Sequence, residues 1–166
     1  MADLFIRPAR EADLPVVGAI TVQAYSADGY VTAHDDYAKT LADATSRFRD
    51  AEVLVAVDET GEVLGSVTVV HPGTPYAEVS QPGEMEFRML SVSTAARGRG
   101  VGEALVRAVI DKARAAGASQ VVLSSSEKMV AAHRLYQRLG FTRLPDRDWA
   151  PVPGLALMAY GYGMPL

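Results

Sequence analysis

Apolar residues recur every three or four positions in four stretches of the chain, the period of an amphipathic α-helix. The first stretch follows Asp13, a residue type that can cap a helix. Its apolar positions are Leu14, Val17, Ile20 and Ala24. The same spacing predicts helices over residues 33–49, 100–116 and 128–139. In residues 33–49 the expected apolar face is Tyr37, Leu41, Ala44 and Phe48. Gly117 and Gly140 directly follow the last two helices and are expected to end them.

Runs rich in β-branched residues alternate with turn residues in other parts of the chain. Residues 52–57 and 63–70 are two such runs, and the polar segment 58–62 between them predicts a hairpin. Further strands are predicted over residues 4–7, 85–92, 120–125, 141–144 and 155–160. Strands outnumber helices, and the hairpin precedes strand–helix units. We therefore expect a single α/β domain, residues 1–166, with helices packed on a mixed sheet.

Composition narrows the class of protein. Apolar residues make up 49% and charged residues 22%, as in folded globular proteins. The chain has no cysteine, which excludes a disulfide framework, a thiolate metal site and a cysteine nucleophile. No apolar run approaches about 18 residues, and the first residues lack the basic and apolar regions of a signal peptide. We expect a cytoplasmic protein that does not contact a membrane.

Charge is distributed unevenly along the chain. Residues 1–84 carry 5 Lys/Arg and 14 Asp/Glu, and residues 85–166 carry 11 and 6, for a net charge of −4. An acidic protein binds nucleic acid poorly, so no nucleic-acid partner is expected. The basic half favours a small anionic ligand and the acidic half a cationic one. Alternatively, the uneven distribution of charge arises by chance and indicates no ligand.

The segment from Arg97 to Gly102 carries three glycines and two arginines between a predicted strand and a predicted helix. Glycines let backbone N–H groups approach an anion, and the helix adds its positive end, so a phosphate-binding turn is predicted. The dinucleotide pattern Gly-x-Gly-x-x-Gly fails because Glu103 stands at its last position, and no Gly-Lys-Ser/Thr triplet occurs here. The pattern Arg-x-x-Gly-x-Gly of coenzyme A-dependent N-acyltransferases fits. A solvated glycine-rich turn is the alternative.

Two longer segments resemble the signatures of one family. Residues 90–102, Leu-Ser-Val-Ser-Thr-Ala-Ala-Arg-Gly-Arg-Gly-Val-Gly, resemble the central strand–turn–helix motif of the GNAT acetyltransferase superfamily. Residues 132–141 resemble its second signature, Ala-x-x-Leu-Tyr-x-x-Leu-Gly-Phe. The resemblance spans about residues 4–144. It implies a mixed, mostly antiparallel sheet of six to seven strands, with about four helices on both faces, splayed between the fourth and fifth strands.

The resemblance also implies a reaction and a donor. Acetyl-CoA would give its acetyl group to an amine by direct attack in a ternary complex, with no covalent enzyme intermediate. Backbone groups of the fourth strand would pair with the pantetheine arm, and N–H groups of the glycine turn would hold the pyrophosphate. Carried over by position, the cofactor-binding residues are Leu90, Ser91, Val92, Arg97, Gly98, Arg99, Gly100, Val101, Gly102 and Glu103. No metal site is expected.

Two residues are candidates for proton transfer. Tyr136 matches the family's frequent general acid, and a phenol with a pKa of about 10 can protonate a leaving thiolate; a core tyrosine is the alternative. Glu86 lies six residues before Val92, on the same strand face by period-2 alternation, and matches a catalytic Glu of some branches. Glu84 acting through a water, or a water alone, are alternative bases. Alternatively, Glu84 and Glu86 have no catalytic role and are solvated carboxylates at the start of a strand.

Two positions depart from the family's pattern. Ser124 stands where many relatives carry a Glu, and Met129 where many carry a cofactor-contacting Asn. They leave open a second class of function, a catalytically inactive acyl-CoA-binding sensor or regulatory module. Release of the CoA thiol in the presence of an amine distinguishes the two classes.

Several other residues carry weaker expectations. His133 is expected at the surface, and Trp149 is expected to pack a loop. A homodimer supported by Tyr160, Tyr162 and Met164 is an open alternative. The acceptor, a small-molecule amine or a peptide amine, cannot be read from the sequence, because acceptor pockets are built from loops.

Overall fold

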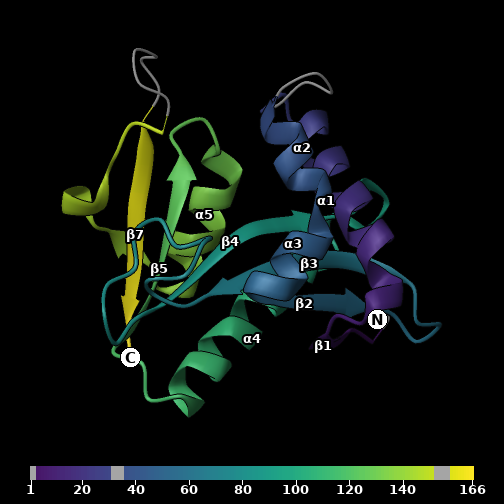
Figure 1. Ribbon diagram of the computed structural model, residues 1–166, viewed down its shortest axis with the longest axis horizontal. Helices are drawn as coiled ribbons and strands as arrows, with labels where there is room; N and C mark the ends of the chain where they lie inside the picture. The colour runs from purple at the N-terminus through teal and green to yellow at the C-terminus, as the bar shows by residue number, and fades with distance from the viewer. Residues whose placement is uncertain (1–2, 31–35, 152–157) are drawn as a thin grey trace. The chain divides into compact units, whose positions relative to one another are not determined.

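Seven strands form one mixed sheet in the computed structural model of the chain (Figure 1), which describes residues 3–30, 36–151 and 158–166. Their order is β1-β2-β3-β4-β5-β7-β6. The chain divides into two compact units. The first unit is Met1–Val69 with Met89–Val109, and the second unit is Val70–Arg88 with Ile110–Leu166. The division passes through β4, so each unit contains part of that strand. The single-domain prediction stays a prediction.

The first unit is built on the predicted hairpin. Its elements are β1 (Phe5–Pro8), α1 (Leu14–Ala27), α2 (Asp36–Ala42), α3 (Ala44–Asp50), β2 (Glu52–Val57), most of β3 (Val63–Val70), the end of β4 (Met85–Val92) and the start of α4 (Val101–Ala115). β2 pairs antiparallel with both β1 and β3. The Asp58 carboxylate closes the hairpin turn by accepting hydrogen bonds from the N–H groups of Thr60, at 2.9 Å, and Glu62, at 3.1 Å.

Helices cover both faces of this hairpin, as the resemblance implied. Alternate β2 residues form a buried cluster with residues of α1 and α3; its members include Val53, Val55, Val57, Leu14, Val17 and Ala44. On the opposite face, Gly65 of β3 lies under α4, where an added Cβ would stand 2.8 Å from the Val101 side chain. Burying one valine stabilises a fold by about 1.5–3 kcal/mol. The alternation along β2 and β3 therefore accounts for a three-layer arrangement within this unit.

The single helix predicted over residues 33–49 is wrong over its described part. The structure has two short helices, α2 and α3, because Asp43 leaves the helical conformation and caps α3. Its carboxylate accepts a hydrogen bond from the Ser46 N–H at 3.0 Å. The break changes the phase of the apolar face, so Tyr37 and Phe48 are exposed. Residues 33–35 of the predicted helix lie outside the described residues.

A buried arginine holds the two short helices together. Arg47 of α3 is fully buried and donates hydrogen bonds to the carbonyl oxygens of Thr40 and Leu41, each at 2.9 Å. It also donates to the Thr21 hydroxyl of α1 at 3.4 Å. Because the last carbonyls of a helix carry partial negative charge, a cation at this position stabilises the end of α2.

The second unit is built around β5. Its elements are the start of β4, the end of α4, β5 (Gln120–Ser126), α5 (Val130–Leu139), β6 (Thr142–Arg143) and β7 (Ala159–Pro165). β5 is parallel to β4 at two register pairs, Met85↔Val121 and Glu86↔Val122. It is antiparallel to β7 along its whole length, and the two strands run side by side in Figure 1.

The position of the last strand differs from the prediction. A strand was predicted over residues 155–160, but β7 begins at Ala159 and continues to Pro165. Its register with β5, from Ser126↔Ala159 to Gln120↔Pro165, satisfies the backbone groups of every β5 residue on that side. Residues 155–157 lie outside the described residues. Within the described part of the chain, no helix is both long and apolar enough to cross a membrane.

Candidate active site

The glycine turn forms an open cradle of backbone at the start of α4. Gly98 and Gly100 have φ values of +82° and +76°. A residue with a Cβ adopts this left-handed conformation at a cost of about 1–2 kcal/mol. A Cβ added at either glycine would meet no atom within 4 Å, so the space beside both backbones is open. α4 begins at Val101, and the N–H groups of its first turn lack intrahelical acceptors.

The side chains of the predicted cofactor-binding residues have different surroundings. Val101 and Ser91 are buried. Leu90 and Val92 are half-buried on β4, and Arg99 is exposed. Gly102 and Glu103 are half-buried in the first turn of α4, where Glu103 forms an ion pair with Arg107 at 3.7 Å. Residues 97–100 thus form a turn that leads directly into the first turn of α4 at residues 101–103.

Arg97 is ion-paired in this structure. Its two terminal nitrogens donate to the two carboxylate oxygens of Asp28, each at 2.9 Å. Asp28 caps the C-terminal end of α1, and the hydrogen bonds from Arg97 to it raise the pKa of the guanidinium further. The side chains remain 44% and 39% exposed. The arginine that sequence analysis assigns to the pyrophosphate is therefore paired with a carboxylate of α1's C-terminal cap.

β4 is not a regular strand between the predicted base and the predicted pantetheine contacts. Met89 has a φ of +56°, a conformation that is uncommon for a residue with a side chain. The period-2 argument that put Glu86 on the same face as Leu90 and Val92 assumed a regular strand, and it does not extend across this residue. The strain at Met89 also marks the point where β4 passes from the second unit to the first.

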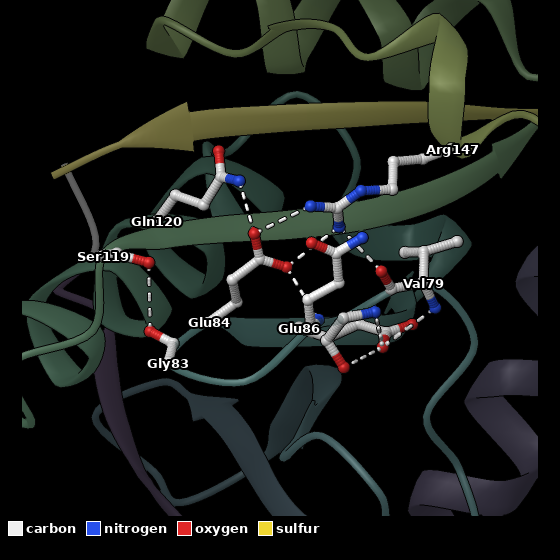
Figure 2. Close-up of polar contacts among 9 residues, drawn as sticks. Val79, Gly83, Glu84, Glu86, Ser119, Gln120 and Arg147 are labelled. Carbon is white, nitrogen blue, oxygen red and sulfur yellow. Dashed lines mark hydrogen bonds and ion pairs between the residues drawn. The ribbon is translucent and has the colours of Figure 1, made fainter.

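Glu86 is fully buried and its carboxylate is surrounded by donors (Figure 2). The backbone N–H groups of Glu78, Val79 and Ser80 donate to it at 3.1–3.4 Å, and the Ser80 hydroxyl donates at 2.8 Å. Glu86 therefore fixes the segment 78–80 against β4.

Glu84, the alternative base, is held by an arginine that sequence analysis did not single out. Arg147 donates to both Glu84 oxygens at 2.9 Å and to the Val79 carbonyl at 2.7 Å (Figure 2). The Gln120 side-chain amide and the Gln81 backbone N–H also donate hydrogen bonds to the Glu84 carboxylate. Burial opposes ionisation, but the hydrogen bonds from Arg147, Gln120 and Gln81 together hold the pKa of Glu84 below its usual value. Glu84 is thus a buried ion-pair partner.

A third carboxylate was missed by sequence analysis. Glu78 forms an ion pair with Arg88 of β4, with 2.9 Å between the carboxylate oxygen and Nε. Its side chain keeps 22% of its exposure. Burial, with the charge of Glu86 adding to it, raises the pKa of Glu78 despite the nearby Arg88. A sequence feature could have indicated this cluster of charged residues: three glutamates and an arginine lie within residues 78–88, around a Pro-Gly turn.

Tyr136 lies in an aromatic cluster of the second unit. Its ring centroid is 5.8 Å from that of Phe87 and 6.0 Å from those of Phe141 and Tyr162. The side chain is 5% exposed, and burial raises the pKa of Tyr136 far above that of a free phenol. The hydroxyl therefore stays protonated at neutral pH, as a proton donor must before it acts.

The end of β5 carries a row of serines that bind side chains of other elements. The Ser124 hydroxyl accepts a hydrogen bond from the Trp149 indole at 2.8 Å, so Trp149 ties its loop to β5. The Ser125 hydroxyl lies 3.1 Å from Nε2 of His133. The expectation of a surface His133 is wrong, since the residue is 8% exposed and packs on Tyr160 and Tyr162. Burial lowers the pKa of His133.

The described residues contain no group of three or more His, Asp or Glu side chains placed to hold a metal ion. The expectation that the protein has no metal site stays a prediction.

Comparison with known proteins agrees with the resemblance in the sequence. The sequence model of the Acetyltransferase (GNAT) family matches residues 19–141. N-acetylaspartate synthetase from Danio rerio is 39% identical over 71 residues, which cover 43% of this chain and 25% of that protein. The match thus covers about a quarter of the relative's length.

Two solved structures cover nearly the whole chain. A GCN5-related N-acetyltransferase from Kribbella flavida is 26% identical, covers 98% of each chain and has a TM-score of 0.70. Ribosomal-protein-alanine N-acetyltransferase from Brucella melitensis is 25% identical, covers 98% of this chain and 99% of its own, and has a TM-score of 0.70. The predicted fold class is confirmed, with seven strands and, in the described residues, five α-helices.

Proposed function

Because the chain belongs to the acetyltransferase (GNAT) family, we propose that it moves the acetyl group of acetyl-CoA to an amine acceptor by direct attack. The observation that carries the proposal is the open glycine turn. Gly98 and Gly100 expose their backbones beside the start of α4 with no neighbouring atom in the way. Backbone N–H groups at a helix N-terminus are a ready site for a phosphate group.

The donor would be held mainly by backbone. We assign the pyrophosphate to the N–H groups of residues 98–103, with Arg97 beside them, and the pantetheine arm to the backbone of residues 90–92 on β4. The open space beside Gly98 and Gly100, at the start of α4, supports the assignment of the pyrophosphate. Arg97 would exchange its carboxylate partner Asp28 for a phosphate oxygen.

The transfer itself needs two proton movements. The neutral amine nitrogen attacks the thioester carbonyl carbon, the C–N bond forms and the C–S bond breaks. We assign the proton taken by the leaving thiolate to the Tyr136 hydroxyl, which burial keeps protonated. We assign the removal of the amine proton to the carboxylate cluster that contains Glu86, with a water as the alternative acceptor. Charge-stabilising and acid–base groups of this kind each raise rates by about 10²–10⁴-fold.

A second function is favoured by one observation. Ser124, where many relatives carry a glutamate, is already engaged by the Trp149 indole. The end of β5 therefore supplies no carboxylate to act as a base. A protein without a base at this position could bind acyl-CoA without transferring its acyl group. The carboxylates of Glu78, Glu84 and Glu86, in and just before β4, support the enzyme instead, so we keep the binding module as the alternative.

Two measurements test the proposal in sequence. Titration calorimetry with acetyl-CoA, with NADH and ATP as controls, should show selective binding of acetyl-CoA. Release of the CoA thiol is then followed with a panel of amines: aspartate and a peptide with an N-terminal alanine, suggested by the names of the relatives, and spermidine as a polyamine. Binding without thiol release from any amine would support the sensor, and no binding by a folded sample would refute both functions.

Three further expectations keep the status of predictions. The acceptor is a small-molecule or peptide amine, which family membership supports without naming the compound. A cytoplasmic location and a homodimer supported by Tyr160, Tyr162 and Met164 rest on the sequence alone.

A further inference from the structure

We propose that Glu78 is the residue that accepts the proton of the acceptor amine, and that Glu86 acts by positioning it. The inference rests on the proposed acetyl transfer to an amine. All the contacts that carry it lie within the second unit, between the segment 76–80 and the start of β4.

Glu86 is occupied by its structural partners. Its carboxylate is fully buried and receives the N–H groups of three consecutive residues and the Ser80 hydroxyl. A substrate amine has no exposed surface of Glu86 to contact. The same hydrogen bonds hold the backbone of Glu78, whose own N–H lies 3.1 Å from Glu86. Glu86 thus determines where the Glu78 side chain starts.

Arg88 holds the other side of the same segment. Its Nε lies 2.9 Å from the Glu78 carboxylate, and its Nη1 donates to the Tyr76 carbonyl at 3.0 Å. Its guanidinium also lies over the Tyr76 ring, 5.9 Å from the centroid. Glu86 and Arg88, two residues apart on β4, therefore fix the segment at two points, and the Glu78 side chain keeps part of its exposure, 22%.

Of the three carboxylates in this region, Glu78 has the properties of a base that a substrate can reach. It keeps 22% of its side-chain exposure, whereas the Glu84 side chain keeps 6% and is held by Arg147. The charged groups around Glu78 are Arg88 and Glu86 on β4, with Arg147 on the neighbouring Val79 carbonyl. Burial and Glu86 raise the pKa of Glu78, which brings it closer to the range where a general base is effective.

The proton balance is complete without any further reactant. The ammonium form of the acceptor gives one proton to the Glu78 carboxylate, which becomes a carboxylic acid, and the free amine then attacks the thioester. The leaving thiolate takes the Tyr136 proton, and the second proton of the attacking nitrogen restores Tyr136. Glu78 then releases its proton to water. The sum is ammonium plus acetyl-CoA giving amide, CoA thiol and one proton.

The test compares Glu78→Gln, Glu86→Gln and wild type, with Glu62→Gln as the matched control because Glu62 is an exposed glutamate of the β2–β3 turn. The rate of CoA-thiol release is measured against pH with the most active amine of the panel. Circular dichroism and acetyl-CoA calorimetry confirm that each variant is folded and binds the donor. We expect Glu78→Gln to lower kcat/KM by about 100-fold or more and to remove the acidic limb of its pH profile. Glu86→Gln should lower kcat/KM but keep that limb.

A second acceptor separates a base from a structural residue. Hydroxylamine is largely unprotonated at neutral pH, so it does not need a base before it attacks. Glu78→Gln should therefore lose much less activity with hydroxylamine than with the basic amine, whereas a damaged site would lose both equally. The inference is overturned if Glu78→Gln keeps wild-type kcat/KM and its acidic limb, or if Glu86→Gln alone removes the limb. Wild-type protein that releases no CoA with any amine would instead refute the proposed function.

Discussion

Replacing Asp28 with asparagine should tighten the binding of acetyl-CoA. Arg97 donates to both carboxylate oxygens of Asp28 at 2.9 Å. A pyrophosphate that takes Arg97 must break this pair, so removing the carboxylate charge lowers the cost of binding. Loss of the Asp28 charge also removes electrostatic repulsion between this carboxylate and a pyrophosphate at the glycine turn. Both effects lower the dissociation constant of acetyl-CoA.

The size of the effect follows from the exposure of the pair. The Arg97 and Asp28 side chains are 44% and 39% exposed, and half-exposed ion pairs contribute about 0.2–1 kcal/mol. At about 1.4 kcal/mol per factor of ten, the dissociation constant should fall about 1.5- to 5-fold. The gain should shrink at high ionic strength, because salt screens exposed charges. Arg97→Gln should weaken binding by about 10- to 150-fold, the equivalent of one charge-assisted hydrogen bond of about 1.5–3 kcal/mol.

Calorimetry of a double-mutant cycle tests the reasoning. Asp28→Asn is titrated with acetyl-CoA alone and in the Arg97→Gln background, where no partner exchange can occur and only the smaller tightening from the lost repulsion is expected. Asp111→Asn, an equal charge change at an exposed aspartate of α4, is the control. Weaker binding by Asp28→Asn would mean that Asp28 orients Arg97 toward the phosphate. Equal tightening in both backgrounds would mean simple charge repulsion. Either result would refute the exchange.

Four further predictions concern single residues. Tyr136→Phe should lower kcat by about 100-fold with little change in acetyl-CoA affinity; turnover equal to wild type at every pH would show that the phenol supplies no proton. Gly100→Ala should cost about 1–2 kcal/mol of stability, since φ is +76°, and weaken acetyl-CoA binding by calorimetry. Arg47→Met leaves two carbonyls of α2 without their donor and should cost about 3 kcal/mol, lowering Tm by about 6–12 °C in a thermal melt; a shift under about 2 °C would contradict it. Glu84 has a depressed pKa when folded, so it stabilises the fold above about pH 4.3, and this contribution is lost as pH falls through the folded-state pKa; Glu84→Gln, compared by urea unfolding at pH 7 and pH 3.5, should be destabilised more at pH 7.

Local features of the fold followed from local sequence. The φ values of the glycine turn, the end of α5 at Gly140, and the β2–β3 hairpin with its Asp58 turn each depend on residues within a few positions of one another. Because these features depend on short-range steric and hydrogen-bonding preferences, they can be predicted from the sequence. The break at Asp43 belongs to the same class and could have been read from its Ser46 partner three residues later, a capping signal that the apolar spacing of the helix concealed.

The roles of the carboxylates depended on pairing over longer distances. Period-2 alternation could not anticipate the positive φ of Met89 within β4, nor that the N–H groups of residues 78–80 would enclose Glu86. The pairing of Glu84 with Arg147 joins residues 63 positions apart, and the burial of His133 depends on β7. Motif spacing identifies the family because the motifs are contiguous. Which glutamate is buried and which is exposed depends on how distant segments pack, because burial and hydrogen-bond partners are properties of the folded chain.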